Sequence, residues 1–242
     1  MAQKVALVHF NHLLVNGQVM WHDLGTTDKR PNYGDMLVCA SLLQQLDDEA
    51  RTFRVGFGRT ADRSFDVALI RGSTYMHGKF DFRKAITTLD SLDGPVAIIG
   101  LGAQSPRQDP TFLDDNQDAR EFIEKLAEKS KSISVRGEFT AEVVSRLGAK
   151  DIRVTGCPSL FYTRTVPKVV LPEMLASPQR RLAVSLHTGL RNSMYCRDPN
   201  NARAKHVAAI NHAIRNSAKA SLFEQGVKLE FDLSDHRLLM AD

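Results

Sequence analysis

The chain has 242 residues, 43% of them hydrophobic and 25% charged, which is the composition of a globular protein with a full core. The formal net charge of +4 suits a small anionic substrate, but no block of lysine and arginine argues for a nucleic-acid partner. The three isolated cysteines give neither a zinc-binding spacing nor a disulfide framework, and no apolar run spans a membrane, so a cytoplasmic protein is predicted.

Strand and helix patterns alternate along the first two-thirds of the chain. Strands are predicted at 4–10, 53–57, 65–70, 95–102, 133–135 and 152–155, and helices from 34 to 46, 80 to 92, 115 to 131 and after 137. This order predicts a mainly parallel, Rossmann-like α/β lobe over residues 1–165. His9 is predicted to point inward from the first strand, so the histidines near it are not interpreted as a metal site.

Asn32-Tyr33-Gly34-Asp35 lies at a junction between a loop and a helix. A glycine turn with Asp35 as a capping residue is the plain interpretation. A loop that touches substrate is the functional one. We expect both, because a capped helix start fixes the loop and leaves Asn32 and Tyr33 facing a cleft.

Two further strands end in small-residue turns. The strand that ends at Ile70 leads into Arg71 and Gly72, near which an anion could bind. The strand from Pro95 leads into Gly100-Leu101-Gly102, one residue short of a dinucleotide-binding motif, because Ser105 replaces its third glycine and a proline follows directly. A tight turn, and not a nicotinamide site, is therefore predicted there.

The stretch Ser132–Thr140 organises the chain. Residues 133–135 form the end of a buried strand, and Phe139, Val143 and Leu147 give the helix after it an apolar stripe. Arg136 is thereby placed at the carboxyl end of a strand and beside a helix N-terminus, where open α/β sheets bind anions. An arginine that only forms a salt bridge to a neighbouring helix is equally compatible with this position.

The last third of the chain predicts a second, smaller α/β lobe that is incomplete. The prolines in the segment 166–180 indicate a linker, and residues 181–242 contain a strand at 181–187, a helix at 202–223 and a strand at 227–233. His187 and Arg191 flank the glycine turn after the first of these strands. Both are candidates for a site between the lobes.

Two pieces of this sequence resemble a known family. Ser134–Thr140, with Leu147-Gly148 and Val154–Leu160, is similar to the central signature of the polysaccharide pyruvyl transferases, and Asn32–Leu37 resembles their N-terminal element. The resemblance implies two facing GT-B-like lobes that transfer a pyruvyl group from phosphoenolpyruvate to two hydroxyls of a sugar, giving a pyruvate ketal. The implied acceptor is a cell-surface polysaccharide or its lipid-linked precursor. This chemistry requires no metal or redox cofactor. A homo-oligomer is one possible assembly of the chain.

The resemblance implies that Arg136 binds the donor anion. The position of His187 at a strand end makes it a candidate proton donor, and the alternative is a histidine that only caps its turn through a hydrogen bond. The turn position of Arg191 makes it a candidate ligand of the departing phosphate. The remaining substrate-binding residues predicted are Asn32, Gly34, Asp35, Gly100, Gly102 and Ser159. The family's late Arg-x-His element is absent from this sequence. The alternatives are therefore a catalytically incomplete relative that binds a sugar, a phosphate or a partner subunit, and a GT-B-like glycosyltransferase.

Overall fold

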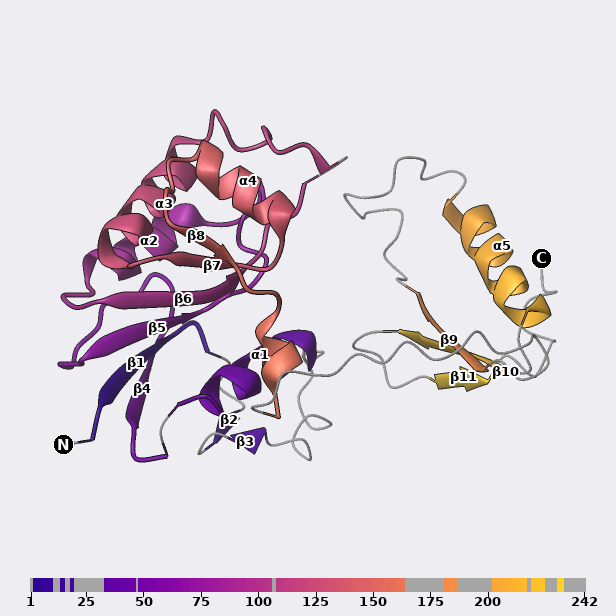
Figure 1. Cartoon of the computed structure of the whole chain (residues 1–242), viewed down its shortest axis with the longest axis horizontal. Helices are drawn as coiled ribbons and strands as arrows, with labels where there is room; N and C mark the ends of the chain where they lie inside the picture. Colours follow the sequence, from indigo (N-terminus) through magenta and orange to yellow (C-terminus); the bar gives the residue numbers. More distant parts are fainter. Residues whose placement is uncertain are drawn as a thin grey trace. The chain divides into compact units, whose positions relative to one another are not determined.

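The protein is described here by a computed structural model of the 242-residue chain (Figure 1). The described residues are 2–10, 14–15, 18–19, 33–46, 48–105, 108–163, 181–186, 202–216, 219–224 and 230–232. They form two compact units, one holding the elements from β1 to η3 and the other those from β9 to β11. The predicted linker 166–180 lies outside the described residues, so the predicted domain boundaries stay a prediction.

The first unit is built on a six-stranded parallel sheet with the order β4-β1-β5-β6-β7-β8. Its strands are β1 (Lys4–Val8), β4 (Arg51–Val55), β5 (Val67–Arg71), β6 (Val96–Leu101), β7 (Ile133–Val135) and β8 (Ile152–Val154). A separate antiparallel pair is formed by β2 (Leu14–Val15) and β3 (Gln18–Val19). The predicted Rossmann-like α/β fold is confirmed for this unit, whereas its likeness to a GT-B lobe stays a prediction.

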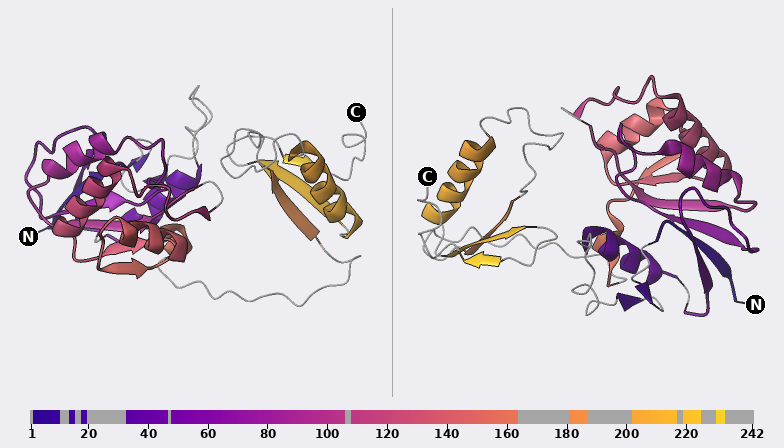
Figure 2. Two further views of the ribbon diagram at one scale, coloured as in Figure 1. Left: turned by 90° about the horizontal axis from the view of Figure 1, so that it is seen from above. Right: turned by 180° about the vertical axis from the view of Figure 1, so that it is seen from behind.

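Helices cover both faces of this sheet (Figures 1 and 2). They are α1 (Tyr33–Leu43), α2 (Phe82–Asp90), α3 (Gln117–Lys129), α4 (Glu138–Arg146) and the 3-10 helix η3 (Pro158–Phe161). Ala6 and Val8 of β1 belong to the core shared with α2, α3 and α4, whereas Val5 and Leu7 pack with α1 on the other face. Because both faces are buried, the central strands are continuous hydrophobic runs.

The strand order reverses beside β1. From β1 the chain continues to β4 on one side, and it then returns to place β5 on the other side of β1. In open α/β sheets, ligands bind in the crevice outside the carboxyl ends of the two strands at such a switch point. This fold therefore binds its ligands beside two segments. One is the chain just after β1, which ends at Val8, and the other is the end of β5 around Arg71.

A bulge interrupts β6 close to the same edge. Ile98 pairs with Ile133 and Leu101 with Val135, so β6 has one residue more than β7 between these two pairs. Gly100 lies in this interval with φ of +76°, a left-handed conformation that glycine adopts without strain. The tight turn predicted at Gly100 is thus a bulge within the strand.

The second unit contains β9 (Arg181–Leu186), α5 (Ala202–Arg215), β10 (Lys219–Glu224) and β11 (Glu230–Asp232). β9 and β10 are parallel, and β11 is antiparallel to β10. The helix predicted over 202–223 is wrong beyond Arg215, because residues 219–224 instead pair with all six residues of β9. Two strands were expected in this lobe, and the described residues contain three.

Candidate functional site

Arg136 directly follows β7 and lies across the carboxyl ends of its neighbours. Its Nε donates to the carbonyl of Gly100 at 2.9 Å and its Nη2 to the carbonyl of Gly72 at 3.2 Å. Gly137, the N-cap residue of α4, comes next. Among the described residues no carboxylate forms an ion pair with Arg136, so the guanidinium is held by main-chain carbonyls and its charge is not neutralised there.

Arg71 ends β5 and is almost completely buried, with 4% of its surface exposed. Its Nη1 lies 2.7 Å from Asp35 Oδ1, and its Nε donates to the carbonyl of His9 at 2.9 Å. Burial opposes the charge, but the nearby Tyr75 and Asp35 outweigh it and raise the pKa of Arg71. Arg71, which the sequence suggested as an anion ligand, is therefore engaged with the protein's own carboxylate.

Asp35 lies in the first turn of α1, where the helix dipole favours a carboxylate. Besides the ion pair with Arg71, its Oδ1 accepts a hydrogen bond from Ser73 Oγ at 3.0 Å. Its side chain remains 32% exposed. The segment that contains Gly34 and Asp35 is thus fastened to the end of β5, at the switch point of the sheet.

Glycines let the strand ends approach one another closely at this edge. The Gly72 amide donates to the carbonyl of Ile99 at 2.9 Å, and the Gly102 amide donates to the carbonyl of Ser73 at 2.8 Å. A Cβ at Gly100 would lie 2.4 Å from Cδ of Pro158, so the start of η3 packs directly on the bulge. These contacts fix the backbone segments against which the Arg136 side chain lies.

The structure brings some of the predicted site residues together and leaves others apart. Gly100 and Gly102 lie beside Arg136, and Asp35 is joined to them through Arg71 and Gly72. Ser159 lies in η3, where its hydroxyl donates to Cys157 Sγ at 3.1 Å. The remaining three, Asn32, His187 and Arg191, lie outside the described residues.

Sequence reasoning missed Gly72 and Ser73. Their carbonyls accept hydrogen bonds from Arg136 and Gly102, and the Ser73 hydroxyl binds Asp35. A signal for them was present, because Arg71-Gly72-Ser73 follows a buried strand in the same way as the other glycine turns. It was interpreted as a place for an external anion instead of a link between two parts of the site.

His9 corrects an expectation. It does not point inward from β1 but follows the strand with φ of +60°, and the residue lies at the surface with its ring partly covered. One face of the ring stacks on Phe57, with centroids 4.5 Å apart, and an edge contact is made to Tyr75. Partial burial, followed by the charge of Arg71, lowers the pKa of His9 to about 4, although Asp35 opposes this.

The depressed pKa of His9 predicts a pH-dependent stability. An unfolded histidine takes up a proton near pH 6.5, whereas the folded one does so only near pH 4. Stability contributed by neutral His9 is therefore present above pH 6.5 and is lost as the pH falls toward 4. Because His9 lies at the surface and solvent reaches part of the ring, we expect a modest slope in the thermal midpoint between these values.

His9→Asn is the variant that isolates this effect, because asparagine tolerates the left-handed conformation and does not titrate. Thermal unfolding of both proteins from pH 4 to 8 should give curves that converge at the acid end. Parallel curves over the whole range would contradict the role given to His9.

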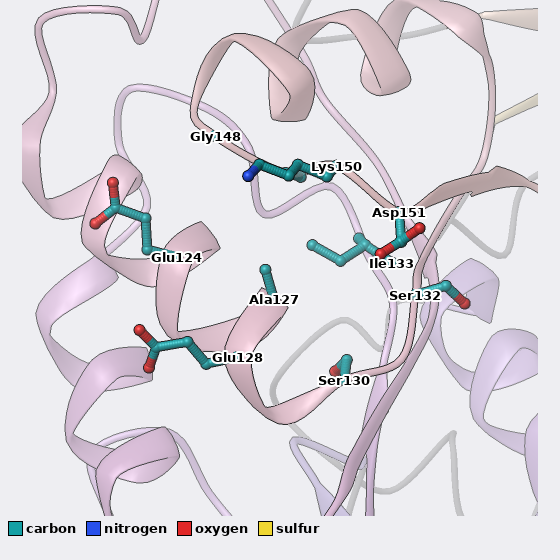
Figure 3. A pocket seen from close by; sticks show the side chains of 10 residues that line it. Glu124, Ala127, Glu128, Ser130, Ser132, Ile133, Gly148, Lys150 and Asp151 are labelled. Atoms are coloured by element: carbon teal, nitrogen blue, oxygen red, sulfur yellow. The ribbon is translucent and has the colours of Figure 1, made fainter.

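A pocket of about 300 Å³ lies at the opposite edge of the sheet, around the amino ends of β7 and β8 (Figure 3). Glu124 and Glu128 of α3 line one part of it, and Lys150 and Asp151 line another. None of the predicted site residues is among its lining residues. Because parallel sheets bind ligands at the carboxyl ends of their strands, this pocket is not the candidate site.

Comparisons with known proteins bear on this site. A family model described as polysaccharide pyruvyl transferase matches residues 32–234, and neither the curated proteins nor the solved structures gave a match. The matched range begins at Asn32 and includes Asp35, Arg71 and Arg136. Across the described residues, no three histidine, cysteine, aspartate or glutamate side chains are grouped to hold a metal ion. Of the helices described, none combines the length and hydrophobicity of a membrane span.

Proposed function

Because the chain belongs to the polysaccharide pyruvyl transferase family, we propose that it transfers a pyruvyl group from phosphoenolpyruvate to two hydroxyls of one sugar. The products are a cyclic pyruvate ketal and free phosphate. The acceptor is a sugar of a cell-surface polysaccharide or of its lipid-linked precursor, modified on the cytoplasmic side of the membrane.

The observation that carries this proposal is the setting of Arg136. Two of its nitrogens are fixed on the carbonyls of Gly100 and Gly72, so the orientation of the guanidinium plane is set before a ligand arrives. Phosphoenolpyruvate carries a carboxylate and a phosphate, the oxyanions that arginine binds with geometric specificity. The N-terminus of α4, which starts two residues later, adds a partial positive charge at the same place.

The reaction also requires a proton donor and a cation. Addition of the first sugar hydroxyl to C2 of the donor requires a proton on its methylene carbon, which becomes the methyl group. Attack of the second hydroxyl at C2 then expels phosphate, whose charge needs a cation. Both hydroxyls lose their protons to a base, which balances the proton delivered to the methylene carbon and the one that leaves with the phosphate. His187 stays our proposed proton donor and Arg191 our proposed phosphate ligand.

The function is tested by following phosphate release from phosphoenolpyruvate. We expect phosphate release that depends on an acceptor, using a panel of monosaccharides and oligosaccharides with free vicinal or 4,6-hydroxyls. The product should be heavier than the acceptor by the mass of pyruvic acid minus one water. Phosphoenolpyruvate binding without release would instead support the catalytically incomplete relative. Release of the nucleotide from a nucleotide sugar would instead support the glycosyltransferase.

A further inference from the structure

We propose that Arg71 is a positioning residue that couples the Gly34-Asp35 segment to Arg136 across the switch point of the sheet. The expected effect of Arg71 on catalysis rests on the proposed function. The coupling between the two segments does not, because it concerns contacts within the protein.

The side chain of Arg71 joins segments far apart in the sequence. It leaves β5 and reaches the first turn of α1 through Asp35, and the residue after β1 through the His9 carbonyl. Among the described residues, Asp35 is the carboxylate that pairs with this buried cation. A buried charge needs its partner, so the start of α1 is held where Arg71 requires it.

The main chain of the same segment holds Arg136. The carbonyl of Gly72, the next residue, accepts from Arg136 Nη2 at 3.2 Å. The carbonyl of Arg71 itself accepts from the Tyr75 hydroxyl at 2.7 Å, and Tyr75 is buried. The segment Arg71–Gly72 is therefore linked through the Arg71 side chain to Asp35 and through the Gly72 carbonyl to the arginine proposed to bind the donor.

A lysine cannot replace this arrangement. The rigid guanidinium fork reaches two segments at once, because Nε donates to the His9 carbonyl while Nη1 lies 2.7 Å from Asp35 Oδ1 in an ion pair without hydrogen-bond alignment. An ammonium on a flexible stem keeps the charge but has no such fork. Arg71→Lys thus separates the positioning role from the charge.

The experiment compares Arg71→Lys and Asp35→Asn with the wild type, with Arg83→Lys as control. Arg83 of α2 forms ion pairs with Asp118 and Glu121 of α3, outside α1 and α4, so the control loses an arginine ion pair without touching the two segments that are measured. Hydrogen exchange of amides 37–40 reports on the start of α1, and exchange at 136–142 reports on Arg136 and the first turn of α4. Calorimetry measures the affinity for phosphoenolpyruvate.

Arg71→Lys and Asp35→Asn should each speed exchange at 37–40, and Arg71→Lys also at 136–142, with the control unchanged. We expect the affinity or kcat/KM of Arg71→Lys to fall on the order of a hundredfold, as for a site displaced by about an ångström. Unchanged exchange in both segments would overturn the proposal, as would exchange raised uniformly over the whole first unit. Failure of the wild type to bind phosphoenolpyruvate would refute the proposed function and leave the exchange result to decide the coupling.

Discussion

Arg136→Ala is expected to weaken the binding of phosphoenolpyruvate about a hundredfold. The substitution removes the guanidinium that we propose contacts the donor anion, and charge-assisted hydrogen bonds of this kind contribute about 3 kcal/mol, or roughly a hundredfold in affinity. Arg136→Lys should recover only part of the loss, because an ammonium cannot bind Gly100, Gly72 and a ligand in one plane. Calorimetry on the three proteins measures the difference.

Arg153→Ala is the matched control for this measurement. Arg153 is an exposed arginine on β8, the strand next to β7, and it makes no contact with Gly72 or Gly100. Its loss lowers the net positive charge by the same amount, so any effect of charge alone appears in both variants. Equal binding by the Arg136→Ala protein and the wild type would remove Arg136 from the donor site.

The position of Arg136 could be predicted from the sequence because it depends on local order. A strand that ends at Val135, a turn and an amphipathic helix place the residue at the carboxyl edge of a parallel sheet whatever the rest of the chain does. The partners of Arg136 could not be predicted in the same way. The Gly72 carbonyl lies 64 residues earlier in the chain, and only the strand order β5-β6-β7 brings it within reach.

The contact between Arg71 and Asp35 could not be predicted from the sequence either. A turn of small residues after a strand is as suitable for an external anion as for an internal carboxylate, and the local pattern does not distinguish them. The distinction is made by the reversal of strand order beside β1, which brings the start of α1 to the end of β5. Topology, and not residue type, decides that Arg71 binds Asp35.

The wrong prediction that the helix of the second unit continues beyond Arg215 has a related cause. Residues 216–223 continue the polar and apolar spacing of α5, and helix propensity alone favours extending the helix. The helix instead ends at Arg215, and the side-chain amide of Asn216 donates to the His212 carbonyl, which also accepts from the Asn216 backbone amide. Residues 219–224 gain backbone hydrogen bonds by pairing with all of β9, which a local pattern does not reveal.

Gly72→Ala should be among the most destabilising single substitutions in the first unit. A Cβ at this position would lie 2.0 Å from the carbonyl oxygen of Ile99 and 2.3 Å from the carbonyl carbon of Gly100, both of them backbone atoms. Neither can rotate away, so the ends of β5 and β6 must separate and lose the hydrogen bond between Gly72 and Ile99. We expect a loss of about 3 kcal/mol or more in the free energy of unfolding, measured by urea denaturation.

Two other glycines separate this clash from the general effect of adding a methyl group. Nothing lies within 4 Å of a Cβ at Gly78, so Gly78→Ala should change stability by only about 0.5 kcal/mol. At Gly102 the nearest atom is Cδ of Arg136 at 3.4 Å, an ordinary contact with a side chain. Gly102→Ala should therefore fold normally and act, if at all, on donor binding. If Gly72→Ala unfolded at the same urea concentration as Gly78→Ala, the close approach of β5 and β6 that holds Arg136 in place would not exist in solution.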